Sequence, residues 1–351
     1  MSGAPDPGSE VRRDGLHRTA PGREARIGAR GGRRAGRGGE VVPPAEFRSY
    51  YGRAVIKPPV WKAHNIASYL FLGGVAGGAA VLAAGADLTG RPDLRRAARL
   101  VSAGATGLSL TVLVADLGRP GRFVHMLRVV KPTSPMSIGA WLLSGLSPLV
   151  AVAALDEASG LLPRRWAGLV GRVARPGGLA ATAIAPAVTT YTGALIADTA
   201  VPVWHGAYRE LPYLFGASAL AAAGGLVAAV TPPGQAAPAR IAGVAGSVAA
   251  QVLDPAVHRR LGAAAEPLTR GRPGRLLSAS RWCSRVGIAL LAASSLRPSR
   301  VLDVAGGLAL TAESALTKFG WFYAGIDSAA DPKYTVVPQR DRLTDTADAT
   351  R

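Results

Sequence analysis

Residues 64–86 read HNIASYLFLGGVAGGAAVLAAGA and contain no Asp, Glu, Lys or Arg. A helix that crosses a bilayer needs about 20 consecutive, predominantly apolar residues, so this stretch predicts a transmembrane helix. Four more apolar blocks of similar length follow along the chain, at 97–115, 133–155, 176–197 and 211–231. These five blocks predict an all-α, polytopic membrane protein.

Three later stretches have weaker signals for spanning the membrane. They are 236–254, which contains Arg240, 282–297, which is short, and 301–323, which contains Glu313 and Lys318. Together the segments predict a bundle of about eight transmembrane helices over 46–330, or seven if the sixth or seventh segment lies in the membrane interface. Because the spans are rich in Gly and Ala, and small residues let helices approach closely in lipid, we expect tight packing.

The composition argues against a soluble enzyme. Charged residues make up 18% of the chain and hydrophobic residues 48%, whereas a soluble domain averages about 25% charged residues. The net charge of +19 would suit a nucleic-acid binder, but the long apolar blocks argue against that class. The lone cysteine, Cys283, excludes a disulfide within the chain and an iron–sulfur cluster held by this chain alone, which needs about four thiolates.

The two ends of the chain are polar. Residues 1–45 are rich in Arg and Gly with few large apolar side chains, which predicts a disordered tail, and 331–351 predict a polar C-terminal tail. An alternative role for the basic tail is attraction to anionic lipid headgroups. With eight spans, Lys and Arg are more numerous on the side of the termini, so the positive-inside rule places both termini in the cytoplasm.

Polar motifs gather on one side of the predicted bundle. They include His64, Asn65 and Tyr69 at the start of the first span and the loop 116–141 between the second and third. The stretch 191–205 at the end of the fourth span adds further polar and aromatic residues. This asymmetry favours one docking surface or one site over a through-channel. The alternative is that these residues only decorate the membrane interface.

Four stretches of the sequence resemble the NrfD/PsrC family, the polysulfide-reductase-type membrane subunits of molybdenum or tungsten oxidoreductase complexes. They are DLGRPGRFVHMLRVVKPTSPMSIGAW at 116–141, YLFLGGVAGG at 69–78, YTGALI at 191–196 and DPKYTVVPQR at 331–340. The resemblance extends over about 60–340. It implies an eight-helix bundle in the inner membrane that binds a quinone, carries no redox cofactor and anchors a ferredoxin-like iron–sulfur subunit beside a molybdopterin subunit.

The residue types agree with a quinone as substrate, either menaquinone or ubiquinone. Imidazole, amide and phenol groups can donate hydrogen bonds to quinone oxygens, which selects His64, Asn65 and Tyr191, with Tyr69 on the same helical surface as the first two. Asp116 could relay protons to the site. No two histidines face each other inside the predicted spans, so we expect no haem, and no metal site or catalytic residue is predicted in this chain.

Two further sets of charged residues have predicted roles. Arg119, Arg122, Arg128 and Lys131 form a basic loop that suits the docking of an acidic iron–sulfur partner. Glu313 lies within a predicted span, where ionisable groups are costly and face the bundle interior. It belongs either to a proton path or to an ion pair with Lys318 or a neighbouring Arg.

The predicted function is therefore a quinone-interacting anchor that exchanges electrons between an iron–sulfur subunit and a membrane quinone. Such a chain is either non-catalytic alone or the quinone-reactive subunit of an oxidoreductase complex. Two alternatives stay open, a secondary transporter and a purely structural anchor without a quinone site. The transporter is disfavoured because the sequence shows no clear internal repeat.

Overall fold

The computed structural model describes residues 55–57, 59–117, 121, 125–161 and 163–339, and this part of the chain is helical without strands. Eight long helices make up the bundle: α1 (Ala63–Leu88), α2 (Pro92–Asp116), α4 (Pro135–Glu157), α5 (Arg164–Ala197), α7 (Leu211–Val230), α8 (Ala237–Leu261), α10 (Gly271–Leu296) and α11 (Arg300–Ala330). Short helices α6 (Pro202–Gly206) and α9 (Glu266–Thr269) lie between them. The predicted tail at 1–45 falls outside the described residues, and so does the part of the predicted C-terminal tail 331–351 that begins at residue 340.

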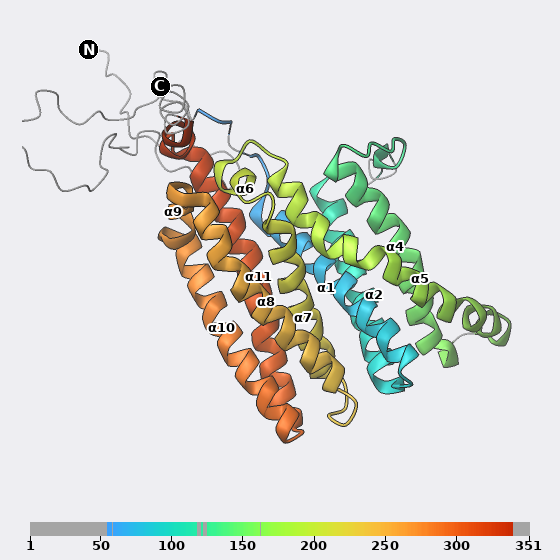
Figure 1. Ribbon diagram of the computed structural model, residues 1–351. Coiled ribbons are helices and arrows are strands. Elements are labelled where there is room, and N and C mark those ends of the chain that lie inside the picture. The colour runs from blue at the N-terminus through green and yellow to red at the C-terminus, as the bar shows by residue number, and fades with distance from the viewer. Residues whose placement is uncertain (1–54, 58, 118–120, 122–124, 162, 340–351) are drawn as a thin grey trace, which may run out of the picture.

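The long helices form two groups of four (Figure 1). One group contains α1, α2, α4 and α5, and the other contains α7, α8, α10 and α11. The groups join where α7 packs against α1 and α5 and where α11 packs against α1. Successive long helices run in opposite directions, so α1, α4, α7 and α10 all start at the end that carries α6 and α9, termed the α6 end (Figure 1).

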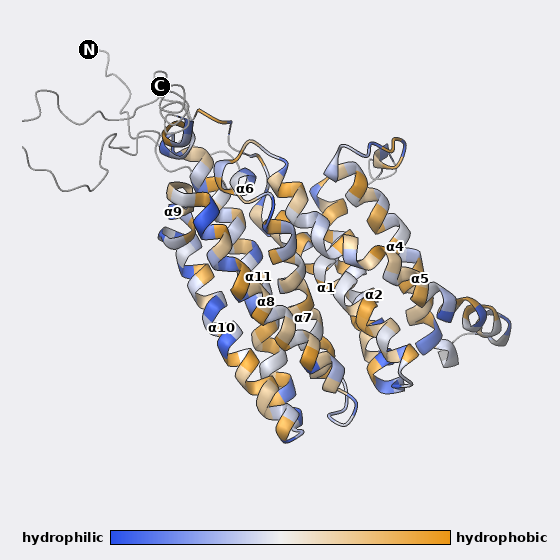
Figure 2. Ribbon diagram, in the orientation of Figure 1, coloured by the Kyte–Doolittle hydropathy of each residue, from blue (hydrophilic) through white to orange (hydrophobic). Residues whose placement is uncertain are grey.

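Five described helices are long and apolar enough to cross a membrane, namely α1, α2, α4, α5 and α7. They confirm the five strong spans of the sequence. The weaker segments α8, α10 and α11 have 25, 26 and 31 residues. At a rise of about 1.5 Å per residue, each is long enough for a hydrocarbon core about 30 Å thick, although each carries charged residues (Figure 2).

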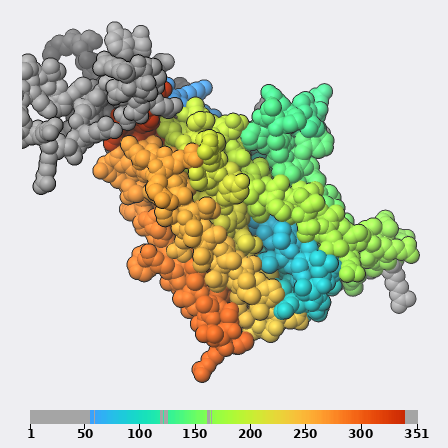
Figure 3. Space-filling view, in the orientation of Figure 1, coloured from blue at the N-terminus to red at the C-terminus, as the bar shows by residue number. Residues whose placement is uncertain are grey.

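Helices α5 and α10 begin well before the apolar stretches predicted for them. Helix α5 begins at Arg164 instead of 176, and α10 begins at Gly271 instead of 282. Charged side chains do not end a helix, because the hydrogen bonds that hold the helix together join backbone groups. Four arginines therefore lie within the first part of α10, at 272, 275, 281 and 285. Helix α10 forms a lateral edge of the molecule (Figure 3).

Close backbone contacts between the helices depend on glycine. A Cβ atom on Gly224 would collide with the backbone of Gly243, and one on Gly307 would collide with the backbone of Gly225. These contacts hold α7 tightly against α8 and α11. They agree with the dense packing that the small-residue composition predicts.

Candidate functional site

A pocket of about 110 Å³ opens inside the first helix group, near the α6 end. Its walls come from the start of α1, the end of α2, the start of α4 and the last turns of α5. The lining is mainly apolar and includes Leu143, Met126 and Met136. Its polar groups belong to Tyr69, Asp116 and Tyr191, so three of the predicted site residues meet here although they come from three helices.

The two tyrosines are fixed inside the helix group. Tyr69 is 5% exposed and Tyr191 is 8% exposed. The ring of Tyr191 lies against Gly139, where an added Cβ atom would overlap the ring. The missing side chain at Gly139 thus leaves the space that Tyr191 occupies. Sequence inspection had no signal for this contact, because α4 and α5 meet only in the fold.

Asn65 is hydrogen-bonded to Asp116 and does not itself line the pocket. Its Nδ2 donates a hydrogen bond of 2.6 Å to Asp116 Oδ1, which joins the start of α1 to the end of α2. Asp116 itself is an exposed residue that also lines the pocket, so it connects the pocket with the surface. His64 precedes Asn65, but its side chain is exposed and is not part of the pocket lining.

The loop before α4 lies next to this pocket and presents Arg128 and Lys131 as exposed residues. Its backbone is held in place, since the Val129 carbonyl accepts hydrogen bonds from Ser137 Oγ at 3.1 Å and Trp141 Nε1 at 3.3 Å. The other two predicted docking residues, Arg119 and Arg122, lie outside the described residues.

An aromatic cluster connects the pocket to the second helix group. Trp61, which lines the pocket, stacks on Trp204 of α6 with 5.9 Å between ring centroids. Trp204 donates a hydrogen bond of 2.8 Å from Nε1 to the Trp321 carbonyl on α11 and packs against Phe322. Trp204 is fully buried, so it packs inside the bundle and does not decorate its surface.

The predicted proton-relay residue Glu313 lies elsewhere, on α11 in the second group. It is 3% exposed, and its Oε2 accepts a hydrogen bond of 3.2 Å from Ser247 Oγ. Lys318 is directed to α7 instead, where its Nζ donates to the Phe215 carbonyl at 3.2 Å. Within the described residues, no ion pair joins Glu313 to Lys318 or to an arginine.

The opposite end of the first helix group contains an ionic network that sequence analysis missed. It comprises Asp87, Arg95, Arg99, Asp156, Glu157 and Arg175. The sequence suggested only scattered arginines at that end. The sequence gives no indication of this pairing, because the members of the network come from four different helices, α1, α2, α4 and α5.

No set of three or more His, Cys, Asp or Glu side chains in the described ranges is placed to hold a metal ion. The expectation that this chain has no haem and no cluster stays a prediction. A family model described as "Polysulphide reductase, NrfD" matches residues 55–232, which include the first helix group, α6 and α7. No curated protein matches the chain.

Proposed function

Since the chain belongs to the polysulphide reductase NrfD family, we propose that it is the quinone-interacting membrane anchor of an oxidoreductase complex. It exchanges electrons between an iron–sulfur subunit and a membrane quinone, while a molybdopterin subunit carries the substrate chemistry. The chain is a multi-pass membrane protein, and we place it in the inner membrane with both termini in the cytoplasm.

The observation that carries the proposal is the pocket between α1, α2, α4 and α5. Apolar walls suit a quinone ring, and the phenols of Tyr69 and Tyr191 are hydrogen-bond donors for its oxygens. The volume of about 110 Å³ is below the range of about 300–1,000 Å³ that is typical for drug-sized ligands. Met126 and Met136 line the pocket, and their flexible side chains can move to admit the ring.

Quinone reduction consumes protons as well as electrons, and Asp116 is positioned to deliver them. It borders the pocket, it is exposed, and Asn65 holds its carboxylate by a hydrogen bond of 2.6 Å. His64 lies at the same helix end in an exposed position, where an imidazole can act as a proton shuttle between solvent and a carboxylate. We propose that His64 transfers protons between solvent and Asp116, and that Asn65 positions the Asp116 carboxylate.

The partner subunit docks on the basic loop beside the pocket. Arg128 and Lys131 are exposed there together with the apolar side chains of Val129 and Val130. An acidic protein that carries iron–sulfur clusters could contact both the positive charges and the apolar side chains of this loop. Electron transfer favours the arrangement, because it brings the partner's cluster close to the quinone ring.

Quinone-dependent turnover of the assembled complex tests the proposal. Tyr191→Phe, which keeps the ring and removes the hydroxyl, should weaken the apparent quinone affinity, and Asp116→Asn should slow turnover. Tyr213→Phe is a matched control, since Tyr213 is an exposed residue on α7 outside the pocket lining. If Tyr191→Phe and Asp116→Asn both behave like wild type in an intact complex, the quinone site is not in this pocket and a structural anchor becomes the better reading.

A further inference from the structure

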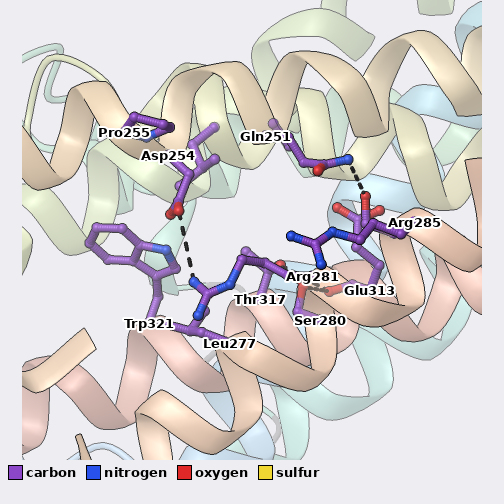
Figure 4. A pocket seen from close by; sticks show the side chains of 13 residues that line it. Gln251, Asp254, Pro255, Leu277, Ser280, Arg281, Arg285, Glu313, Thr317 and Trp321 are labelled. Carbon is purple, nitrogen blue, oxygen red and sulfur yellow. Dashed lines mark hydrogen bonds and ion pairs between the residues drawn. The ribbon is translucent and has the colours of Figure 1, made fainter. Parts of the chain in front are cut away.

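A second pocket, of about 240 Å³, lies in the other helix group between α8, α10 and α11 (Figure 4). Unlike the first pocket, it has a strongly polar lining that includes Asp254, Arg281, Arg285 and Glu313. Figure 4 shows Asp254 and Arg281 facing each other from neighbouring helices, with Trp321 toward one end and Glu313 toward the other. Apart from Leu214, the residues that line this pocket lie outside the residues that match the family model.

A chain of hydrogen bonds leads from the pocket wall to the Glu313 carboxylate. Gln251 Nε2 donates to Ser284 Oγ at 2.8 Å. Ser284 Oγ and Ser247 Oγ are 2.5 Å apart, and Ser247 Oγ donates to Glu313 Oε2 at 3.2 Å. Hydroxyl groups can both donate and accept, so this chain can pass a proton as well as hold the carboxylate.

The cationic groups around Glu313 make their direct contacts to other groups, although the charge of Lys318 still acts on the Glu313 carboxylate. Arg281 is 3.8 Å from Asp254, and Arg285 stacks over the Trp282 ring at 5.3 Å. Lys318, on the same helix, is directed to the Phe215 carbonyl of α7. A buried carboxylate is costly without a cation bonded to it, which favours the neutral acid, and the Ser247 hydroxyl can hydrogen-bond to the carboxyl group in either form.

From this arrangement we propose that the pocket is a water-filled inlet through which Glu313 exchanges protons with the side of the membrane that carries the α6 end. A volume of about 240 Å³ has room for several waters, which occupy about 30 Å³ each in the liquid. Asp254 and Trp321 lie closer to the α6 end of their helices than Gln251 and Glu313 do. A proton from this water adds to the carboxylate and returns to water, so the exchange needs no redox partner.

Labelling with a hydrophobic carbodiimide, dicyclohexylcarbodiimide, tests whether Glu313 becomes protonated. The reagent adds to protonated carboxyl groups, and mass spectrometry of the full-length protein in lipid locates the adduct. We expect an adduct on Glu313 that is lost as pH rises. Asp303 is the matched control, because it is also buried on α11 but binds Arg240 at 2.6 Å and should stay unlabelled. Absence of label on Glu313 at every pH, or equal labelling of Asp303, overturns the proposal.

Cysteine accessibility tests the water path without any change to Glu313. In a Cys283→Ser background, Gln251→Cys and Thr317→Cys should react with a membrane-impermeant thiol reagent added from the α6 side. Ser218→Cys, which is fully buried between α7 and α11, should not react. Tyr208→Cys, exposed just after α6, identifies that side in sealed vesicles. If neither pocket cysteine reacts, the inlet is closed and the proposal fails.

Both measurements use the chain without a quinone or a partner subunit. Failure of the proton inlet is therefore distinguishable from failure of the proposed quinone site, which depends on turnover of the assembled complex.

Discussion

Arg240 illustrates how a single charged residue is accommodated inside the helix bundle. It is 2% exposed, and its guanidinium donates two hydrogen bonds to Asp303, of 2.6 and 2.8 Å. It donates a third to the Pro233 carbonyl at 2.8 Å, while Ser294 Oγ donates to Asp303 Oδ1 at 2.7 Å. The pair connects α8 to α11.

Removing one partner of this pair should destabilise the protein. Arg240→Ala leaves the Asp303 carboxylate buried without a cation, which typically costs about 3–5 kcal/mol. We expect a loss of that size in the free energy of unfolding, measured by chemical denaturation in detergent micelles. The exposed Arg259 of α8 provides the control Arg259→Ala. The free energy of unfolding of the double variant Arg240→Met/Asp303→Leu should be closer to wild type. An equal loss in Arg240→Ala and in the double variant would contradict the ion-pair explanation.

Gly139 controls the space for Tyr191 in the proposed quinone pocket. Gly139→Ala forces its new methyl group against the Tyr191 ring, and overpacking of this kind typically costs about 1–3 kcal/mol. If the ring moves into the pocket, apparent quinone affinity should fall by roughly five- to 150-fold, since 1.4 kcal/mol is a factor of ten. Gly107→Ala on α2, where an added Cβ atom meets open space, should leave affinity unchanged. If a folded Gly139→Ala complex binds quinone with unaltered affinity, Tyr191 is not part of the quinone site.

At the scale of elements, the α6 end is tied together by short helices and ion pairs. Glu266, at the start of α9, binds Lys333 beyond the end of α11 at 2.5 Å and also pairs with Arg270. Burial raises the pKa of Glu266, but the Lys333 hydrogen bond and the charges of Lys333 and Arg270 outweigh it and hold the pKa below its usual value. This contact fastens the residues after α11 to the bundle.

The lowered pKa makes this contact sensitive to acid. A carboxyl whose pKa is lower in the folded state contributes stability above its unfolded pKa of about 4.3, and the contribution is lost as pH falls through the lower folded pKa. We expect hydrogen exchange in the segment 331–339 to accelerate below about pH 4 in wild type. In Glu266→Gln, exchange in this segment should already be faster at pH 7 and should change less with acid. Equal acid dependence in both proteins would show that another group controls this segment.

For the whole molecule, the two helix groups divide the chemistry. The first group has an apolar pocket with two phenols and lies beside the basic loop. The second group has the polar pocket with Glu313. Because α7 and α11 pack against α1, the two pockets belong to one continuous bundle, although the quinone site and the proton inlet remain separate proposals.

Docking of the partner subunit should depend on charge at the basic loop. Arg128→Glu combined with Lys131→Glu reverses two exposed charges and should slow association with the iron–sulfur subunit, most strongly at low salt, because steering by charge is screened as ionic strength rises. The matched control is Arg96→Glu, an exposed residue at the opposite end. Association rates with the purified partner at several salt concentrations provide the measurement. If the association rate falls equally in the Arg128→Glu/Lys131→Glu variant and in Arg96→Glu, the loop is not the docking surface.

The sequence alone determined the helical membrane fold and the family. Spanning helices depend on local composition, because a stretch such as 64–86 must satisfy its backbone hydrogen bonds internally and bury apolar side chains in lipid. The five confirmed spans and the motif at 116–141 are features of this kind, readable without knowledge of any contact between helices.

Tertiary structure decided how residues from different helices meet. The Asn65–Asp116 hydrogen bond, the contact of Tyr191 with Gly139 and the pairing of Arg240 with Asp303 each depend on which helix faces which. Composition does not encode that choice, because rotating a helix by a third of a turn changes every neighbour while leaving its hydropathy unchanged. For the same reason, only the fold shows that Glu313 borders a polar pocket while the Lys318 ammonium contacts the Phe215 carbonyl.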